Sequence, residues 1–305
     1  MNEFLEILKK SDVGKIEEEV LLSKHTTYKV GGKASLIVYP KDLKKLIVLL
    51  KLCQGHKIRY KVLGNGSNTL FSDRLFRGVI IKLTAFDKIK FFKNSLNVGA
   101  GVSLMKVANM AVRKGLSGLE FATGIPGTIG GAVFMNAGAY KSDMGYVVKK
   151  CKVLTPDFRV INMTNRELNF HYRSSFFQKN PNYICLEASI DLKKGDVSEM
   201  IDLVKDRRTR RMNSQPLDFP SAGSVFRNPS ADMPAGKLID DLGLKGLCRG
   251  GAKISDKHAN FIININNAKA SDVMELIVFA KEAVKDKYNI DLKVEQEFVN
   301  WEQDV

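Results

Sequence analysis

The sequence predicts an α+β protein, and three observations support this fold class. Segments with the pattern of strands are mixed with segments of helical periodicity, without the strict alternation of a parallel α/β sheet. No internal repeat or low-complexity tract interrupts them. A glycine-rich stretch over residues 120–140 separates two groups of such elements. It holds five of the 24 glycines, namely Gly124, Gly127, Gly130, Gly131 and Gly138.

The elements follow from local signals taken in order. Residues 1–10 have the pattern of an amphipathic helix. Up to the glycine-rich stretch we expect strands at 35–39, 58–63, 78–83 and on both sides of Lys93-Asn94, and helices opened by Pro40 and Ser103 and ended by Gly55 and Gly115. Beyond it we expect a hairpin of 149–154 with 159–163, a strand at 183–192, a helix capped by Asp196, a helix at 236–242, a strand at 261–265, a helix at 273–287 and a final strand at 290–299.

Length and composition limit the class of protein. A chain of 305 residues, 44% hydrophobic and 27% charged, is long enough for two or three domains with a sizeable core. No window approaches the roughly 18 apolar residues of a membrane span. The first residues carry acids and do not resemble a signal peptide, so we expect a cytoplasmic protein. The four cysteines and four histidines are scattered, which argues against a metal site and a disulfide framework.

The net charge of +15 suggests a polyanionic partner. The basic run 207–211 could bind nucleic acid, or it could form the solvated face of a helix. No known nucleic-acid motif accompanies it, and a small polyanionic substrate would be served by the same charge.

Two glycine-rich loops are candidates for a cofactor site. In residues 120–140, glycines would let a ligand lie against the backbone, and Pro126 would stiffen the loop. We expect N–H groups around Gly130 and Gly131 to point at an anion, although a tight loop between packed elements is the alternative. The loop 64–68 follows a strand but lacks the third glycine of a dinucleotide fingerprint. The candidate cofactor-binding residues are Gly64, Asn65, Gly66, Ser67, Asn68, Gly124, Pro126, Gly127, Thr128, Gly130, Gly131 and Asn136.

Taken together, several motifs resemble the UDP-N-acetylenolpyruvoylglucosamine reductase (MurB) family. The resemblance runs in order over nearly the whole chain, which makes it specific. The motifs are His25-Thr26-Thr27, residues 64–68, 124–140, Tyr172-Arg173-Ser174-Ser175, residues 223–229, 235–240, 255–261 and Leu292-Lys293-Val294-Glu295. Only 50 residues separate Arg173 from Ser224, so the chain resembles the shorter branch, which lacks a substrate-clasping tyrosine loop.

The resemblance implies a two-lobed FAD-binding domain of the vanillyl-alcohol-oxidase (PCMH) type, followed by an α+β substrate domain. The proline-containing segment 212–220 suggests the boundary. We therefore expect lobe 1 at 1–84, lobe 2 at 85–212 and the substrate-binding domain at 213–305, with the terminal strand 290–299 as a candidate to pack back on the flavin lobes. No histidine lies in either flavin loop, so FAD is expected to bind non-covalently.

The implied reaction is the NADPH-dependent, FAD-mediated reduction of UDP-N-acetylglucosamine enolpyruvate to UDP-N-acetylmuramate in peptidoglycan precursor synthesis. Hydride would pass from flavin N5 to the enol ether. The resemblance assigns Arg173 to the substrate carboxylate, Ser224 to proton donation and Glu295 to a protonated acid beside that carboxylate. Glu297 stays open as an alternative to Glu295. The resemblance also assigns substrate binding to Tyr172, Asn228 and Lys245, and we expect a monomer.

Two other hypotheses compete with this one. The chain could be a basic nucleic-acid-binding protein, which would be colourless and would lose its ligand with salt. It could also be another flavoenzyme of the same superfamily, such as an oxidase of a small alcohol. Arg173, Ser224 and Glu295 suit a carboxylate-bearing enol better than an alcohol.

Overall fold

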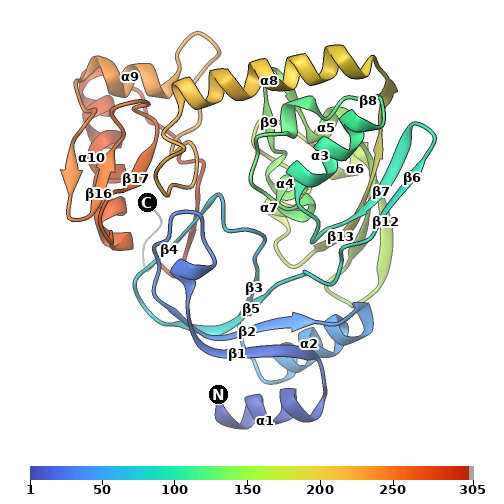
Figure 1. Ribbon diagram of the computed structural model, residues 1–305. Helices are drawn as coiled ribbons and strands as arrows, with labels where there is room; N and C mark the ends of the chain where they lie inside the picture. Colours follow the sequence, from blue (N-terminus) through green and yellow to red (C-terminus); the bar gives the residue numbers. More distant parts are fainter. Residues whose placement is uncertain (302–305) are drawn as a thin grey trace. The chain divides into compact units, whose positions relative to one another are not determined.

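The computed structural model describes residues 1–301, apart from the side chain of Asn2, and divides into two compact units (Figure 1). The first unit consists of residues 1–18, 36–64 and 78–208. The second consists of residues 19–35, 65–77 and those from 209 onward. The chain therefore crosses from one unit to the other several times. The three-part division expected at residues 84 and 212 stays a prediction.

A four-stranded sheet with two helices forms one layer of the first unit. Its strand order is β1-β2-β5-β3, with bounds Gly14–Leu21, Lys33–Pro40, Phe76–Ile81 and Tyr60–Val62. Helices α1 (Asn2–Lys10) and α2 (Leu43–Gly55) pack on it. Phe4 of α1 and Leu46 of α2 share a buried core with Leu36 and Val79 of the sheet, so apolar periodicity in the helices matches the apolar strand face.

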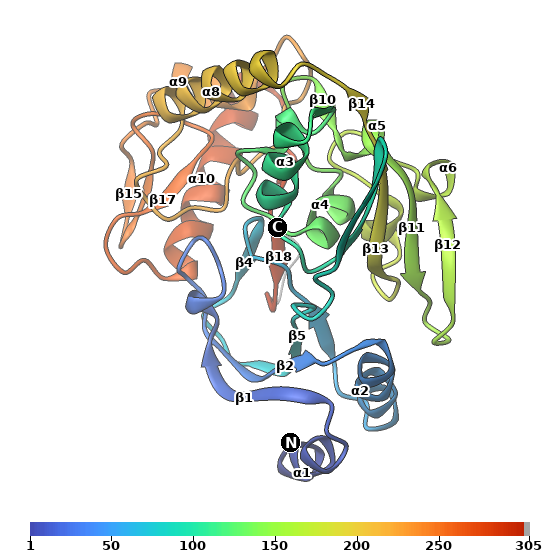
Figure 2. The ribbon, with the colours of Figure 1, turned by 45° about the vertical axis from the view of Figure 1, so that its right-hand side comes forward.

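A five-stranded antiparallel sheet forms the rest of the first unit. Its strand order is β12-β11-β13-β7-β6, with bounds Val160–Thr164, Val148–Leu154, Ile184–Asp191, Ser95–Gly99 and Ile89–Phe92. Helices α3 (Leu104–Arg113) and α4 (Ile129–Met135) lie on one side of this sheet, as Figure 2 shows. The shorter elements of this part are β8 (Leu116–Ser117), η2 (Glu120–Ala122), β9 (Gly138–Ala139), β10 (Ser142–Asp143), α5 (Met144–Val147), α6 (Asn165–Leu168), α7 (Phe176–Lys179) and β14 (Lys193–Lys194).

The second unit is built around one long helix, α10 (Ala270–Tyr288). A three-stranded antiparallel sheet of β15 (Cys248–Arg249), β16 (Ala252–Ile254) and β17 (Ile262–Asn264) packs beside it. Near the end of the described chain, β18 (Glu297–Val299) pairs in parallel with β4 (Thr69–Phe71). The remaining elements are η1 (Leu22–Lys24), α9 (Ala235–Asp241) and α8 (Val197–Ser214), which begins in the first unit and ends in the second.

Most predicted elements are confirmed, and two are corrected. The helix at 43–55 is not opened by Pro40, which ends β2; Asp42 caps it, and its carboxylate accepts the Lys45 N–H at 2.9 Å. The final strand is much shorter than the expected 290–299. Before Glu297 the chain pairs instead with the loop 225–227, through Phe226 and Val294. None of the described helices is long and apolar enough to cross a bilayer.

Candidate active site

The first glycine-rich loop lies against the N-terminal segment of the second unit. Gly66 has φ +62°, and a Cβ there would meet the His25 carbonyl oxygen at 2.5 Å. Glycine is therefore required by the fold at this position. Among the described residues, no acceptor is bonded to the main-chain N–H groups of Gly66 and Ser67. Gly66 is buried and Ser67 is half-buried, and since buried N–H groups nearly always have an acceptor, the two are suited to an anionic ligand group.

In the first unit, the two predicted cofactor loops contact each other. A Cβ at Gly64 would meet Thr128 Oγ1 at 2.7 Å, so glycine permits this close approach. The Lys82 ammonium donates to the Gly64 carbonyl oxygen. Burial lowers the pKa of Lys82 to about 8. Sequence analysis missed Lys82, because only the fold brings it to a loop 18 residues earlier.

The prediction that N–H groups around Gly130 and Gly131 point at an anion is wrong, because both are bonded within the protein. The Gly130 N–H donates to the Ala100 carbonyl oxygen at 2.9 Å, and the Gly131 N–H donates to Thr128 Oγ1 at 3.2 Å. Thr128 thereby caps α4. The Gly127 N–H is also bonded, to the Ile125 carbonyl oxygen at 2.9 Å. These donors are bonded to acceptors within the protein, so the candidate anion donors lie in the 64–68 loop.

Gly131 nevertheless fits a bound cofactor. A Cβ there would meet only Thr128 Oγ1, at an ordinary 3.4 Å, whereas a Cβ at Gly130 would press on Ala100 at 3.0 Å. The fold therefore leaves little space for a side chain at position 130 and leaves room at position 131. A flat ligand lying on the backbone of α4 would occupy that room, which is the expected use of a glycine in a flavin cradle.

The side chain of Asn136 connects two other segments of the first unit. It ends α4 in the left-handed conformation, with φ 44°, and is 1% exposed. Its Nδ2 donates to the His171 carbonyl oxygen at 2.8 Å, and its Oδ1 accepts the Gly145 N–H at 2.9 Å. Both polar atoms of the side chain therefore have protein partners. The structure places Asn136 as the residue that ties the glycine loop to the turn beginning at His171.

Arg173 stands at the tip of that turn. His171 and Ser174 exchange two main-chain hydrogen bonds of 3.0 Å, which leaves Tyr172 and Arg173 as the two tip residues. Arg173 has φ 51°, a conformation that non-glycine residues adopt rarely. Its Nη2 donates to the Gly138 carbonyl oxygen at 2.9 Å, and its guanidinium stacks on the ring of Tyr172. A built and strained turn holds this arginine, which is not a surface strand residue.

Ser224 and Glu295 are neighbours in the second unit. The Glu295 N–H donates to the carbonyl oxygen of Val225, the residue after Ser224, at 2.7 Å. Glu295 is also tied to the first glycine loop, because Asn68 Nδ2 donates to its carbonyl oxygen at 3.0 Å. Glu297, two residues on, bonds through its N–H to the Asn68 carbonyl oxygen at 2.8 Å. The fold thus brings together Ser224, Glu295 and Asn68, which are far apart in the sequence.

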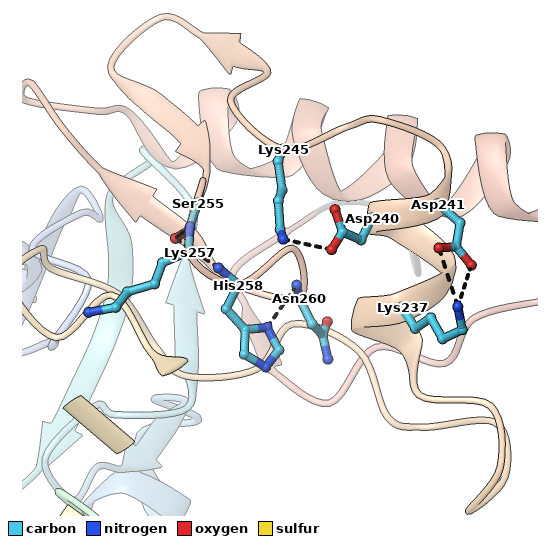
Figure 3. Close-up of polar contacts among 8 residues, drawn as sticks. All are labelled: Lys237, Asp240, Asp241, Lys245, Ser255, Lys257, His258 and Asn260. Atoms are coloured by element: carbon cyan, nitrogen blue, oxygen red, sulfur yellow. Dashed lines mark hydrogen bonds and ion pairs between the residues drawn. The ribbon is translucent and has the colours of Figure 1, made fainter. Parts of the chain in front are cut away.

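The predicted substrate-binding residues of the second unit contact opposite ends of α9. Asn228 Oδ1 accepts the Ala235 N–H at 3.1 Å, and Lys245 Nζ donates to Asp240 Oδ2 at 2.6 Å (Figure 3). Arg227, which supplies the positive charge of the motif 223–229, has a buried Nε without an acceptor among the described residues. A buried cationic nitrogen without an acceptor is costly, and an anionic ligand group would satisfy it.

The basic run 207–211 lies on α8, and part of it is engaged in the fold. The Arg207 guanidinium stacks on the ring of Tyr140 at 4.8 Å, and the Tyr140 hydroxyl donates to the Arg207 carbonyl oxygen at 2.9 Å. Among the described residues, no group of three or more potential metal ligands is found.

Two family models match the chain. The model described as UDP-N-acetylenolpyruvoylglucosamine reductase, C-terminal domain, matches residues 215–299. The model described as FAD binding domain matches residues 34–164.

Similar proteins cover almost the full length of the chain. UDP-N-acetylenolpyruvoylglucosamine reductases of Anoxybacillus flavithermus and Bacillus subtilis are 43% and 40% identical to it, over 98% of the chain and 99% of each relative. The crystal structure of the reductase (MurB) of Thermus caldophilus has a TM-score of 0.80 and 35% identity, over 93% of this chain and 98% of that one.

A more distant structure has the same fold in part. A VAO-type flavoprotein of Myceliophthora thermophila has a TM-score of 0.50 at 15% identity, over 64% of this chain and 47% of that one. The predicted α+β fold with a vanillyl-alcohol-oxidase-type FAD-binding domain is confirmed. The chain belongs to the family of UDP-N-acetylenolpyruvoylglucosamine reductases and is an FAD-dependent oxidoreductase.

Proposed function

We propose that the chain reduces UDP-N-acetylglucosamine enolpyruvate to UDP-N-acetylmuramate, with NADPH as the reductant and FAD as the relay. The names of its relatives support the substrate, and the FAD-binding domain supports the cofactor. The observation that carries the proposal is the main-chain hydrogen bond from Glu295 to Val225, since it sets the proposed acid beside the proposed proton donor. The reaction would serve peptidoglycan precursor synthesis.

Arg173 is proposed to bind the carboxylate of the enolpyruvyl group. A guanidinium binds a carboxylate through two parallel N–H donors and keeps its charge at every physiological pH. One of the nitrogens of Arg173 already donates to Gly138, which fixes the direction of the side chain. The positive charge of Arg173 would stabilise negative charge as it develops on the substrate during reduction.

Ser224 is proposed to donate the proton to the carbon next to that carboxylate. The developing carbanion is a strong base, so a weak but well-placed acid suffices. The loop carrying Ser224 is held in place by hydrogen bonds at the two residues that follow it. Glu295, in its protonated form, would donate a hydrogen bond to the carboxylate, as an acid held neutral by its surroundings can.

The UDP part of the substrate is proposed to lie near α9. Its candidate ligands are Asn228, Lys245 and Tyr172. Lys245 has three donors, so it can contact a phosphate while it keeps its bond to Asp240. The Nε of Arg227 would gain its missing acceptor from an anionic group of the substrate.

The residues fit a non-covalently bound FAD. Room at Gly131 and unengaged N–H groups at Gly66 and Ser67 are the observations that support the fit. When bound, FAD would supply the hydride chemistry that no side chain can perform. Lys82 would add a positive charge beside Gly64. A monomeric state and a cytoplasmic location are part of this proposal, as is the absence of a nucleic-acid partner.

The test is spectroscopic. Purified protein should show the flavin absorption band. Under anaerobic conditions NADPH should bleach this band. Addition of UDP-N-acetylglucosamine enolpyruvate should then restore the band and form UDP-N-acetylmuramate. A colourless protein, or a bleached flavin that the enolpyruvyl substrate leaves unchanged, would contradict the proposal. An alcohol that reduces the flavin would instead favour an oxidase.

A further inference from the structure

Asn260 is a buried asparagine in the loop that joins β16 to β17 (Figure 3). It is 4% exposed, and it bonds to Val225, Phe226 and His258, which all belong to the second unit. A buried amide is costly unless both its donor and its acceptor are bonded. The partners of Asn260 therefore indicate what the residue is for.

Both polar atoms of the Asn260 side chain bond to the backbone of one residue, Phe226. The Phe226 N–H donates to Asn260 Oδ1 at 2.9 Å, and Asn260 Nδ2 donates to the Phe226 carbonyl oxygen at 2.8 Å. The Asn260 carbonyl oxygen also accepts the Val225 N–H, at 2.9 Å. Three hydrogen bonds thus fix two consecutive residues from one side, as a neighbouring strand would.

The other side of the same two residues faces the terminal segment. The Glu295 N–H donates to the Val225 carbonyl oxygen at 2.7 Å, and Phe226 pairs with Val294 in an antiparallel bridge. Residues 225–226 therefore lie between Asn260 and the terminal segment. Asn260 lies on one edge, Glu295 lies on the other, and Ser224 immediately precedes these two residues.

Asn260 is itself held by its own loop. Its N–H donates to His258 Nδ1 at 3.2 Å, and the Ser255 hydroxyl accepts the N–H groups of Lys257 and His258. The ring of His258 packs on Phe261, with centroids 4.9 Å apart. A side chain anchored in this way can transmit its position to the residues that it bonds.

We propose that Asn260 is a positioning residue for the reductive step. By holding the main chain at Val225 and Phe226, it sets where the Ser224 hydroxyl and the Glu295 carboxyl stand relative to each other. The inference rests on the proposed function of those two residues. A displacement of about 1 Å in a reacting group can lower a rate by about 100-fold, so three hydrogen bonds that fix the serine loop matter for the chemistry.

A purely structural role is the alternative, and Asn264 provides the matched control. It is also a buried asparagine of the second unit, 9% exposed, that bonds to the backbone. Its Nδ2 donates to the Tyr28 carbonyl oxygen at 3.2 Å, and its Oδ1 accepts the Ala268 N–H at 3.0 Å. In the part of the chain that the structure describes, Asn264 makes no hydrogen bond to residues 224–228 or 293–297.

The experiment compares Asn260→Asp, Asn264→Asp and Ser224→Ala as flavin-loaded proteins by anaerobic stopped flow. In Asn260→Asp, one oxygen still accepts the Phe226 N–H, but the donor to the Phe226 carbonyl oxygen is lost. Flavin reduction by NADPH should stay within about twofold of wild type, and flavin reoxidation by the enolpyruvyl substrate should slow by about 10- to 100-fold. Asn264→Asp should leave both steps nearly unchanged.

A pH series adds a signature that a loss of stability alone would not give. A protonated aspartic acid can donate to the Phe226 carbonyl oxygen, so the reoxidation rate of Asn260→Asp, relative to wild type, should recover toward about pH 5. Hydrogen exchange should be faster at the Val225, Phe226 and Glu295 amides in this variant. If Asn260→Asp does not load flavin, Asn260→Ser serves for the same rate and exchange measurements.

The outcomes separate the inference from the function on which it rests. If Ser224→Ala slows reoxidation and the Asn260 variants do not, the positioning role is wrong while the proposed function stands. Equal slowing of both half-reactions in Asn260→Asp and Asn264→Asp would also overturn the inference, because it would point to general destabilisation. If Ser224→Ala slows neither step, the proposed proton donor itself is wrong.

Discussion

Two buried asparagines hold the two loops that carry proposed site residues, and they do so in different ways. Asn136, in the first unit, bonds through its side chain to His171 and to Gly145, which belong to two separate segments. Asn260, in the second unit, bonds through its side chain to Phe226 alone. Asn136 thus joins the glycine loop to the turn that carries Arg173, whereas Asn260 fixes one short stretch beside Ser224.

The difference predicts different consequences for the same kind of substitution. Loss of a link between several segments should loosen the fold and the cofactor loop together. Loss of a clamp on one stretch should change the chemistry that this stretch serves and leave the remaining structure in place.

The largest effect on the fold is expected for Asn136→Ala. The substitution leaves the His171 carbonyl and the Gly145 N–H without partners, and it puts alanine at φ 44°. We expect a loss of about 3 kcal/mol of unfolding free energy, together with poor flavin retention. Urea unfolding and the flavin-to-protein absorbance ratio measure these effects.

The matched control is Asn289→Ala, at the left-handed end of α10, where φ is 55°. Asn289 is exposed, so only the backbone cost of about 1 kcal/mol should appear, with flavin retained. Equal losses in the two variants would show that the side-chain bonds of Asn136 contribute nothing.

A large effect confined to catalysis is expected for Glu295→Gln. The variant keeps the shape and a hydrogen-bond donor but loses the acid proton, so enolpyruvyl reduction should fall by about 100-fold with FAD still bound. Glu297→Gln should have a mild effect, because the backbone N–H of Glu297 bonds to Asn68, whereas that of Glu295 bonds to Val225, beside Ser224. Steady-state rates at saturating NADPH test the pair, and the reverse pattern would move the assignment to Glu297.

Gly131 and Gly130 test whether the glycine loop is shaped for the fold or for the flavin. Gly131→Ala adds a Cβ where there is room and replaces a helical glycine, so the flavin-free protein should gain up to about 1 kcal/mol while its flavin affinity falls. Gly131→Val should be folded but pale. Gly130→Ala presses on Ala100 and should lose stability instead. A full flavin complement in Gly131→Val would remove this glycine from the cradle.

The smallest effect is expected at His258. Burial chiefly, and then the charge of Lys245, lower the pKa of His258, whereas Asp240 opposes this shift. The unfolded chain therefore binds more protons than the folded one below the ordinary pKa of histidine. The contribution of neutral His258 to the free energy of unfolding should be complete above about pH 6.5. It should be lost as the pH falls through the lowered pKa of His258, since a proton on Nδ1 displaces the Asn260 N–H. Unfolding of His258→Gln at about pH 7 and about pH 5 should show a flatter dependence than wild type.

Elements with local signals could be predicted from the sequence. Ser103 begins α3, and the hairpin of β11 with β12 forms where turn residues separate two apolar runs. The end of the chain could not be predicted in the same way. Ile290, Leu292 and Val294 alternate like a strand, but they pack on the core while the backbone pairs with the loop 225–227.

The residues of the candidate site could be predicted only from motifs. The acceptors of their hydrogen-bond donors could not, because those acceptors lie far away in the sequence. The N–H of Gly130 is bonded to Ala100, 30 residues away, so its commitment could not be read from the glycines themselves. Lys82 and Asn260 are likewise defined by contacts with Gly64 and Phe226 that no local pattern indicates.

The most direct test of the central claim is Ser224→Ala in the two half-reactions. The serine loop is proposed to serve the enolpyruvyl substrate and not the reduction of the flavin, since hydride transfer to flavin needs no proton donor at the substrate carbon. Anaerobic stopped flow should therefore give flavin reduction by NADPH close to wild type, and flavin reoxidation by UDP-N-acetylglucosamine enolpyruvate slower by at least about 100-fold. Equal slowing of the two half-reactions, or no slowing of the second, would contradict the account.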